Sequence, residues 1–261
     1  MPELPDVETF KRYLDATALH QPIGTVRVGA PRLLHGTTPQ GLGRRLHGQA
    51  LESTRRHGKY LFARVDEAGW LVLHFGMSGR LQYAEASGQL PQDAELLLRF
   101  ENNAGLAYIA PRKLGRIDWS DAPDDYVAAR GLGPDALAID HASFRDLARG
   151  RRGGVKSWLM DQGSLAGIGN LYADEILFQA GIHPGQAVAE LDDETLQALH
   201  TALRRVLRQA IDAAADPDAM PRNFLLPQRR ADGRCPRCGE TVATTRVGGR
   251  TAYYCPRCQP G

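Results

Sequence analysis

The sequence contains no long apolar run and no repeated segment. None of its apolar stretches approaches the ~20 residues that a membrane-spanning helix requires, which excludes a membrane-embedded protein. The first residues also lack the basic segment and apolar stretch of a secretion signal. We therefore expect a cytoplasmic protein without membrane association. Its 261 residues, free of low-complexity segments, are enough for two domains or for one domain with appendages.

Lysine is scarce throughout the chain. Four lysines, at positions 11, 59, 113 and 156, stand against 28 arginines. Genome base composition can produce such a bias, so the number of arginines alone carries little weight. The four lysines are more informative individually, because arginine was used so readily elsewhere.

Cysteine is absent from the first 234 residues and then occurs as two C-x2-C pairs separated by sixteen residues, namely Cys235, Cys238, Cys255 and Cys258. This spacing indicates a zinc site. Four thiolates close a tetrahedral structural site and leave no open position, so the zinc should fold the segment rather than catalyse a reaction. Between the pairs, residues 241–245 and 250–254 read as two strands of a hairpin with Gly248 and Gly249 in the turn. The alternative is that the four cysteines form two disulfides. Disulfides are rare in reducing intracellular compartments, so this alternative fits poorly with a chain that has no export signal.

The C-terminal segment carries a strong positive charge. Residues 221–261 hold eight arginines and two acids, Asp232 and Glu240, a net charge of +6 in a chain whose total is +2. A basic block of this density indicates a polyanionic partner. A solvated face that only aids solubility is the alternative.

The chain begins Met1-Pro2-Glu3, which offers a compact catalytic unit. A small second residue allows removal of Met1 and leaves Pro2 with a free secondary amine, which can attack a carbonyl-like carbon and form a cationic imine. Because an α-amino group titrates near pH ~8, a useful fraction is neutral at physiological pH. Glu3 is placed to transfer protons beside it. The alternative is a frayed, solvated terminus.

The pattern of apolar residues changes from strand-like to helical along the chain. A helix is expected over 6–18, and the short apolar runs that follow, which predict a β-sandwich, lie at 60–65, 70–75, 96–100 and 106–109. A connector punctuated by Pro and Gly spans 122–133. Helices are then expected at 143–149, 155–162, 170–180 and 192–214. The predicted class is α+β, with domains at 1–120, 121–220 and 221–261.

Two glycine-containing turns are candidates for ligand contact. Residues 165–170 join two helices, and the backbone amides at the start of the second helix, with the Asn170 side chain, form an anion site suited to a DNA phosphate. Residues 74–80 follow an apolar strand and present Met77 as an apolar wedge in a tight turn. The alternative for residues 165–170 is a simple connection between two helices. The alternative for residues 74–80 is a plain β-turn with a packed methionine.

These motifs together resemble the formamidopyrimidine-DNA glycosylase/endonuclease VIII family of base-excision repair enzymes. The matching segments cover nearly the whole chain in family order: Pro2-Glu3-Leu4-Pro5, His57-Gly58-Lys59-Tyr60, His74-Phe75-Gly76-Met77-Ser78-Gly79, Pro111-Arg112-Lys113-Leu114-Gly115, Lys156-Ser157-Trp158-Leu159-Met160-Asp161, Gly167-Ile168-Gly169-Asn170-Leu171-Tyr172-Ala173, and the zinc ribbon with Arg250. The resemblance implies an N-terminal β-sandwich with flanking helices, a helix-two-turn-helix module and a zinc-ribbon hairpin. It also implies a monomer that binds double-stranded DNA containing damaged bases or abasic sites.

The resemblance implies a bifunctional DNA glycosylase and abasic-site lyase. Pro2 would form a Schiff base with the deoxyribose of an oxidatively damaged nucleotide, release the base, and cleave the strand by β,δ-elimination with Glu3, Lys59 and Arg250 as catalytic residues. Removing a base from duplex DNA requires extruding its nucleotide. The residues expected to contact the DNA are His74, Met77, Gln92, Arg112, Leu114, Arg152, Lys156 and Asn170. For Arg250 we favour phosphate binding over proton donation, because the pKa of arginine lies above ~12.

The chain departs from the family pattern at several positions. Asp6 replaces a glutamate, Gln92 stands where a histidine is frequent, Leu114 where a larger aromatic is common, and Arg152 where a lysine is frequent. The largest departure is the short segment 216–234, where the formamidopyrimidine enzymes carry a long loop over the flipped purine. This predicts weak discrimination for 8-oxoguanine opposite cytosine, and better activity on ring-opened purines, hydantoins, abasic sites or oxidised pyrimidines.

Two other functions fit part of the sequence. One is a lyase that acts only on abasic sites. The other is a non-catalytic protein that binds damaged DNA through the helical module and the zinc ribbon, although DNA affinity alone does not require an N-terminal amine. Lys59, Pro2 and Glu3 therefore favour the enzyme.

Overall fold

A computed structural model describes residues 1–66 and 68–261. The chain divides into two compact units. The first comprises residues 1–2 and 6–131, and the second comprises residues 3–5 and 132–261. None of the helices in the described part of the chain has the length and apolar character that a bilayer crossing requires.

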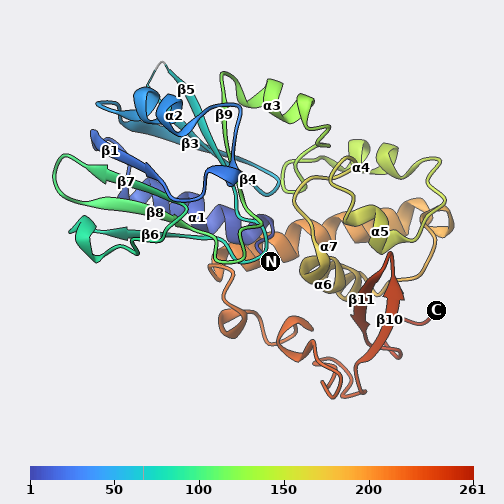
Figure 1. The fold of residues 1–261 in the computed structure, drawn as a ribbon. Helices are drawn as coiled ribbons and strands as arrows, with labels where there is room; N and C mark the ends of the chain where they lie inside the picture. Colours follow the sequence, from blue (N-terminus) through green and yellow to red (C-terminus); the bar gives the residue numbers. More distant parts are fainter. Residues whose placement is uncertain (67) are drawn as a thin grey trace. The chain divides into compact units, whose positions relative to one another are not determined.

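The first unit is a β-sandwich (Figure 1). One sheet has the strand order β1-β7-β8-β6, from β1 (Ile23–Val28), β6 (Arg80–Ala84), β7 (Leu96–Phe100) and β8 (Gly105–Ile109). The other has the order β2-β9-β5-β4-β3, from β2 (Leu34–His35), β3 (Leu51–His57), β4 (Tyr60–Val65), β5 (Gly69–His74) and β9 (Arg116–Ser120). One apolar core takes Leu98 and Leu106 from the first sheet and Leu61 and Leu73 from the second, as expected when two sheets pack face to face.

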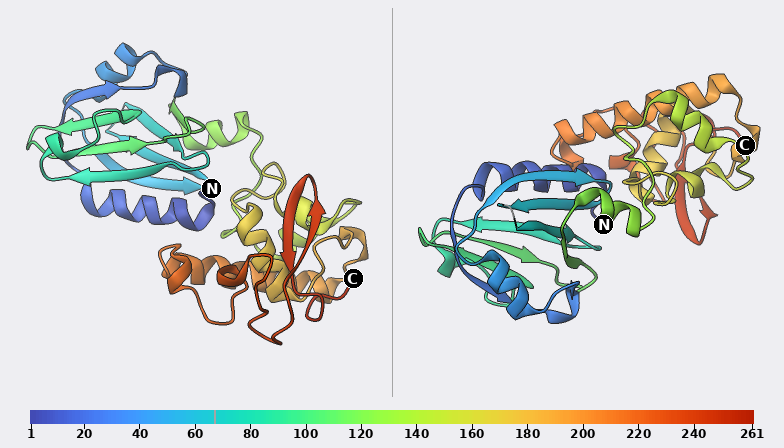
Figure 2. Two further views of the ribbon diagram at one scale, coloured as in Figure 1. Left: turned by 60° about the horizontal axis from the view of Figure 1, so that its bottom comes forward. Right: turned by 90° about the horizontal axis from the view of Figure 1, so that it is seen from above.

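Helices flank the strands of this unit, as Figure 2 shows for α1 (Leu4–Thr17). Sequence reasoning missed two of them. Helix α2 (Pro39–Leu46) begins at Thr38, whose hydroxyl accepts the Gly41 N–H, and this cap with a following proline is a recognisable start signal. Helix α3 (Pro123–Ala129) lies inside the segment expected to be a connector.

Helix α3 explains why the first unit extends to Gly131, beyond the boundary expected at residue 120. The Tyr126 ring packs edge-on against Tyr60 and Phe62, with centroids 5.6 Å apart in both pairs. The Tyr126 hydroxyl donates to Asp118 at 2.9 Å. These contacts with β4 and β9 bind the segment to the sandwich.

The second unit is built on helices α4 (His141–Ala148), α5 (Val155–Leu159), α6 (Asn170–Ala180) and α7 (Asp193–Asp212). Its core contains Ile176 of α6 with Leu199 and Leu203 of α7. The local signals fit the sequence: Asp192 caps α7 by accepting the Thr195 N–H, and Gly181 ends α6 in the left-handed conformation that favours glycine.

The zinc ribbon belongs to the second unit. Its strands β10 (Ala243–Val247) and β11 (Arg250–Tyr254) pair in antiparallel register. The turn residues Gly248 and Gly249 both have positive φ, as a tight hairpin turn requires. Strand β10 begins later than expected because Thr241 pairs with Arg234 in an isolated bridge instead.

Candidate active site and nucleic-acid interface

Glu3 is anchored at the start of helix α6. Its carboxylate is 1% exposed and accepts backbone N–H groups from Gly169 at 2.7 Å, Leu171 at 2.8 Å and Tyr172 at 3.2 Å. A carboxylate at this end of a helix is favoured by the helix dipole as well as by the hydrogen bonds. The anion site expected here for a DNA phosphate therefore exists, but the protein's own Glu3 occupies it.

The glycines of the 165–170 turn make room for the N-terminal residues. A Cβ at Gly169 would lie 2.5 Å from the Glu3 carboxyl group, and a Cβ at Gly167 would lie 2.6 Å from the Leu4 side chain. Gly167 also has a φ of +120°, which other residues rarely adopt. The Leu4 N–H donates to the Gly167 carbonyl at 3.0 Å. The turn is thus shaped to seat residues 3 and 4.

Asn170 and Arg250 are brought to the same region of the second unit. The Asn170 side-chain amide donates to the Thr251 carbonyl at 3.3 Å, so the first residue of α6 holds the residue next to Arg250. The Arg250 guanidinium lies 3.3 Å from the Met160 sulfur. Asn170 therefore lies at the α6 amides that bind Glu3 and also holds strand β11, which carries Arg250.

Lys156 does not occupy the position expected of a DNA contact. Its side chain is fully buried, and its ammonium lies 2.7 Å from Asp174 Oδ1 and 3.2 Å from the Thr251 carbonyl. Burial lowers the pKa of Lys156, and the nearby Asp174 carboxylate opposes that shift. The expectation of direct phosphate binding by Lys156 is therefore corrected: this lysine fastens strand β11 to the helices.

Asp174 is the residue at this site that sequence reasoning missed. Besides Lys156 it binds the Arg229 guanidinium at 2.8 Å and the Tyr253 N–H at 3.2 Å. An acid within the largely apolar α6 sequence was the available signal, because a buried carboxylate requires a cationic or hydrogen-bonding partner. A scarce lysine on a neighbouring apolar helix, Lys156, is the partner that such an acid requires.

In the first unit, Lys59 lies in the tight turn between β3 and β4. Gly58 supplies the positive φ of the turn, and the flanking residues His57 and Tyr60 pair across the strands. The Lys59 side chain is largely buried. Its charge acts on His74, whose ring packs against Tyr60 at 4.8 Å between centroids. The structure therefore brings Lys59 and His74 together.

His74 is held in the neutral form. Burial lowers its pKa to about 4, and the positive charges of Lys59, Arg130 and Arg116 add to the effect. Its Nδ1 accepts the Gly76 N–H at 3.4 Å. At neutral pH this histidine can support the 75–79 turn by hydrogen bonding, but it does not attract phosphate as a cation.

Met77, Leu114 and Arg112 lie on two adjacent turns of the first unit. Met77 is 41% exposed and Leu114 is 54% exposed, which is uncommon for large apolar side chains. Gly76 has a positive φ and packs directly against the Leu114 carbonyl, where a Cβ would overlap it. Arg112 is exposed on the same turn as Leu114. Two apolar side chains and a cation are thus presented together to solvent.

Gln92 and Arg152 are not brought into either group of side chains. Gln92 donates to the Leu90 carbonyl at 3.0 Å and accepts from Arg99 at 3.1 Å, so its polar groups are engaged locally. Arg152 is exposed and has no ion pair among residues 1–66 and 68–261. Their expected DNA contacts stay predictions.

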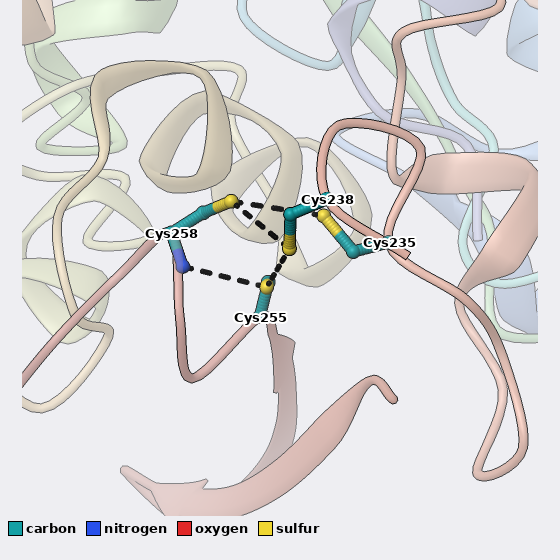
Figure 3. Close-up of side chains that lie close together, drawn as sticks. All are labelled: Cys235, Cys238, Cys255 and Cys258. Carbon is teal, nitrogen blue, oxygen red and sulfur yellow. Dashed lines mark hydrogen bonds between the residues drawn. The ribbon is translucent and has the colours of Figure 1, made fainter. Parts of the chain in front are cut away.

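The four cysteines converge on one point (Figure 3). Their sulfur atoms all lie within 4.8 Å of one another, with Cys238 and Cys255 at 3.5 Å and Cys235 and Cys258 at 3.8 Å. Tetrahedral zinc with Zn–S bonds of ~2.3 Å sets its ligand atoms about 3.8 Å apart. All four thiols are free rather than joined in disulfides. The donor set therefore fits one structural zinc ion.

Removing the zinc should weaken DNA binding through Arg250. Structural zinc supplies ~10–16 kcal/mol of folding free energy in zinc-finger peptides, so Cys258→Ser or chelation should unfold the ribbon. We expect one zinc per chain in the wild type by atomic absorption, and a loss of duplex affinity of about tenfold or more without it, since each lost phosphate contact weakens binding. Re-addition of zinc to the chelated wild type is the control. Equal affinity of the metal-free protein would contradict this expectation.

The large apolar side chains of segment 216–234 are packed in the protein interior. Met220, Phe224, Leu225 and Leu226 are buried, and two short 3-10 turns, Pro217–Ala219 and Leu226–Gln228, shape its course. Leu225 contributes to the small core around Cys235 and Cys255. The segment thus connects α7 to the ribbon along the protein surface and leaves little chain for an additional loop.

Glu175 of α6 holds this segment in place and gives it a pH dependence. Its carboxyl group accepts the Leu226 N–H and the Gln179 amide, both at 2.8 Å. Burial raises the pKa of Glu175 from 4.5 to about 7. The stability linked to this proton is fully present below pH 4.5 and is lost as the pH rises to about 7, a change of about 3 kcal/mol.

Replacing Glu175 with glutamine should flatten that dependence. The amide keeps an acceptor for Leu226 but does not ionise, so the free energy of unfolding should fall less between pH 5 and 7.5 than in the wild type, by about 2 kcal/mol. Urea denaturation at several pH values measures this. Glu194→Gln, at an exposed position of α7, is the matched control. Identical pH profiles for Glu175→Gln and the wild type would refute the assignment.

The geometry defines an α+β protein with a β-sandwich, a helical unit and a ribbon with four clustered cysteines. Family models agree along the chain: the formamidopyrimidine-DNA glycosylase N-terminal domain matches residues 1–117, the H2TH domain of the same enzyme residues 131–218, and the zinc finger found in FPG and IleRS residues 233–261. The chain belongs to the formamidopyrimidine-DNA glycosylase family.

Full-length relatives and solved structures support this membership. The formamidopyrimidine-DNA glycosylases of Methylococcus capsulatus and Stutzerimonas stutzeri are 37% and 35% identical over 272 and 271 residues, covering 99% of this chain and 100% of each relative. Lactococcus lactis formamidopyrimidine-DNA glycosylase, non-covalently bound to DNA containing an AP site, is 27% identical with a TM-score of 0.89 over 99% of this chain and 100% of that one. The same enzyme with FAPY-dG-containing DNA gives 28% identity and a TM-score of 0.88, with the same coverage.

Proposed function

We propose that this protein is a DNA glycosylase that removes oxidatively damaged bases and then cleaves the strand as a lyase. The observation that carries the proposal is the anchoring of Glu3. Three backbone N–H groups fix its buried carboxylate beside Asn170 and next in sequence to Pro2. Capping of α6 accounts for the burial of the carboxylate, whereas its position beside an N-terminal proline amine suits proton transfer in covalent catalysis.

The first chemical step requires Pro2 as a free amine. After removal of Met1, the Pro2 nitrogen attacks the sugar C1′, a nitrogen–carbon bond forms, and the bond between C1′ and the damaged base breaks. The base leaves with the bonding electrons and takes up a proton. The product is a closed-ring aminal in which the Pro2 nitrogen is bonded to C1′. When the C1′–O4′ bond then breaks and O4′ takes up a proton, the nitrogen lone pair forms the C=N bond of a cationic iminium that links Pro2 to the open sugar, as in other covalent amine catalysis.

Glu3 is the proton-transfer group for opening the sugar ring. Its carboxylate is held by the α6 amides within one residue of the amine, which is the positioning that general acid–base catalysis requires. The iminium makes the neighbouring sugar C–H acidic. Loss of that proton expels the 3′ phosphate by β-elimination, and a second elimination expels the 5′ phosphate. In this proposal Lys59, Asn170 and Arg250 bind these phosphates.

The exposed turns of the first unit suit the vacated base stack. An apolar side chain inserted between base steps offsets the stacking lost when a nucleotide is extruded. Met77 and Leu114 supply apolar surface, and Arg112 supplies a cation beside them. We assign these three side chains to the gap in the duplex. Gln92 and Arg152 remain expected backbone contacts.

The short segment 216–234 limits recognition of the base itself. With Met220, Phe224, Leu225 and Leu226 buried, little chain is left to enclose an extruded purine. Specific rejection of the wrong base needs dedicated hydrogen bonds to the base edge. We therefore propose ring-opened purines, hydantoins, oxidised pyrimidines and abasic sites as better substrates than 8-oxoguanine opposite cytosine.

A side-by-side excision assay tests both the activity and the selectivity. Duplexes carrying each lesion, an abasic site or an undamaged base are incubated with the enzyme, and strand cleavage and borohydride-trapped adducts are measured. We expect adducts on all damaged duplexes and slowest excision of 8-oxoguanine. Faster excision of 8-oxoguanine would contradict the selectivity. Adducts confined to the abasic duplex would favour a lyase without glycosylase activity, and no adduct at all would favour a binding protein.

The remaining parts of the proposal concern organisation. We propose a cytoplasmic monomer that binds double-stranded DNA, with catalysis assigned to the sandwich unit up to residue 131 and to the N-terminal residues, DNA binding to the helices of 132–220 and a supporting zinc ribbon at 221–261. The ribbon supports the site because Thr251 is bonded to both Lys156 and Asn170.

A further inference from the structure

The outer face of helix α7 is rich in unpaired positive charge. The face that packs in the core carries Leu199, Leu203 and Val206. Because the helix has 3.6 residues per turn, Thr201, Arg204 and Arg208 lie on the opposite face. Neither Arg204 nor Arg208 forms a hydrogen bond or an ion pair among residues 1–66 and 68–261. By contrast, Arg145 of α4 and Arg149, which follows α4, each have an acidic partner, Asp193 and Asp146 respectively.

These arginines line a groove between α7 and the start of α4. The groove has a volume of about 590 Å³, and Arg204, Arg205, Arg208, His141 and Thr201 lie along it. Its one carboxylate is Asp140, which is engaged by the Ser143 N–H at 2.8 Å as the cap of α4. The groove is thus a positively charged surface with little internal compensation. We call it the α7 groove.

The chemistry of the α7 groove favours a phosphate ligand. The Arg204 Nε is shielded from solvent and has no partner in the described chain, so the groove contains a guanidinium donor that no protein acceptor uses. Arginine, threonine, glutamine and histidine side chains are typical of contacts to phosphate oxygens. No apolar or large aromatic side chain lines the groove, whereas the centre of a protein–protein interface is apolar and rich in aromatics. These features favour a nucleic-acid backbone over an acidic protein.

The position of the α7 groove excludes the DNA segment that carries the lesion. Helix α6, whose first residue is Asn170, lies beside α7 (Figure 1) and shares its apolar core. The groove is lined by α7 residues of the opposite face, such as Thr201, Arg204 and Arg208. Duplex DNA is stiff over ~150 base pairs, so one short segment cannot bend around a helical layer to reach both faces. A ligand in the α7 groove must therefore be a separate segment.

We propose that the α7 groove binds the phosphate backbone of a second duplex DNA segment, without sequence preference. Such a site lets the protein hold one segment at the lesion-binding face while it captures another. Direct transfer between segments then replaces complete dissociation during the search for rare damaged bases. The groove is independent of the chemistry at Pro2, so its test succeeds or fails apart from the proposed glycosylase activity.

A transfer assay tests the α7 groove. The full-length zinc-loaded protein is bound to a fluorescent duplex containing an uncleavable abasic analogue, and its dissociation rate is measured against increasing unlabelled undamaged duplex. We expect the rate to rise with competitor concentration for the wild type. In Arg204→Glu/Arg208→Glu this dependence should fall by about tenfold, because reversed charges repel the phosphates. Affinity for the labelled duplex should change by less than about twofold.

Two control variants separate the groove from general charge effects. Arg204→Lys/Arg208→Lys keeps the charges and should retain transfer, and Arg32→Glu/Arg44→Glu makes the same change of charge at exposed positions of the first unit and should behave as the wild type. A wild-type rate independent of competitor overturns the proposal. The proposal is also overturned if Arg204→Glu/Arg208→Glu loses affinity for the labelled duplex by the same factor as it loses transfer. That result would place the groove in the site that binds the abasic duplex. Transfer driven as strongly by polyglutamate as by DNA would indicate an acidic protein partner and also overturn it.

Discussion

Replacing Pro2 by glycine should reduce base excision on the order of 10³-fold or more, the scale seen when a covalent nucleophile is removed. The pyrrolidine nitrogen gives an iminium that has no N–H to lose, so the charge that activates the sugar persists. The proline ring also prevents rotation about the N–Cα bond and so fixes the direction of the nitrogen lone pair, whereas the amine of a glycine at this position is free to rotate. The residual primary amine of glycine explains why some activity should survive.

Retention of Met1 should abolish the reaction completely. A large residue at position 2 prevents removal of the initiator, and the nitrogen of residue 2 is then an amide without a nucleophilic lone pair. Borohydride trapping on an abasic duplex measures both variants, with mass spectrometry of the N-terminus to confirm processing. Binding of an uncleavable abasic analogue serves as the control for Pro2→Gly and should change by less than about twofold. Undiminished trapping in the variant that keeps Met1 would rule out the imine mechanism.

Glu3→Gln should separate base excision from strand cleavage. The amide removes the negative charge and points an N–H toward one of the donors of Gly169, Leu171 and Tyr172. Loss of a general acid–base group costs about 10²–10⁴-fold in rate, which is the expected fall in excision of a damaged base. An abasic sugar already equilibrates with its open aldehyde, so trapping on a preformed abasic site should fall much less.

Glu8→Gln provides the matched control for this effect. Glu8 lies on helix α1 and pairs with Arg56 at 2.9 Å, so its loss removes a carboxylate close in sequence without touching α6. Excision by Glu8→Gln, measured per folded molecule, should stay within about threefold of the wild type, although loss of one partner of this largely buried pair should lower the melting temperature. A parallel fall in both activities of Glu3→Gln, together with a lowered melting temperature, would instead assign Glu3 a purely structural role.

Local patterns predicted much of the fold. The apolar run 60–65 and the helix 170–180 coincide with β4 and α6, because alternation, caps and a C-terminal glycine are all local signals. The spacing of the cysteines likewise fixed the zinc site. Helices α2 and α3 were missed although each has proline at its first turn. Their apolar content is low, and packing against the sheets stabilises them.

The site was less predictable where long-range contacts decide the role of a residue. The Lys156 side chain is equally able to reach a phosphate or a buried acid, and only the position of Asp174 on a neighbouring helix decides between them. The α6 amides were recognised as an anion site, but their occupant, Glu3, is 166 residues away from Gly169 in sequence. Periodicity and composition carry no information about such pairings.

The anchoring of Glu3 also restricts the conformational freedom of the N-terminus. A terminus ordinarily samples many conformations, yet here the third residue is buried and its carboxylate is held by three backbone groups. Consecutive Cα atoms are ~3.8 Å apart, so the amine of Pro2 can explore only a small volume around this anchor. The nucleophile therefore has fewer rotatable bonds than a lysine side chain and loses less entropy on attack. One additional residue before Pro2 would displace the amine from that volume, so the length of the chain end is itself a catalytic parameter.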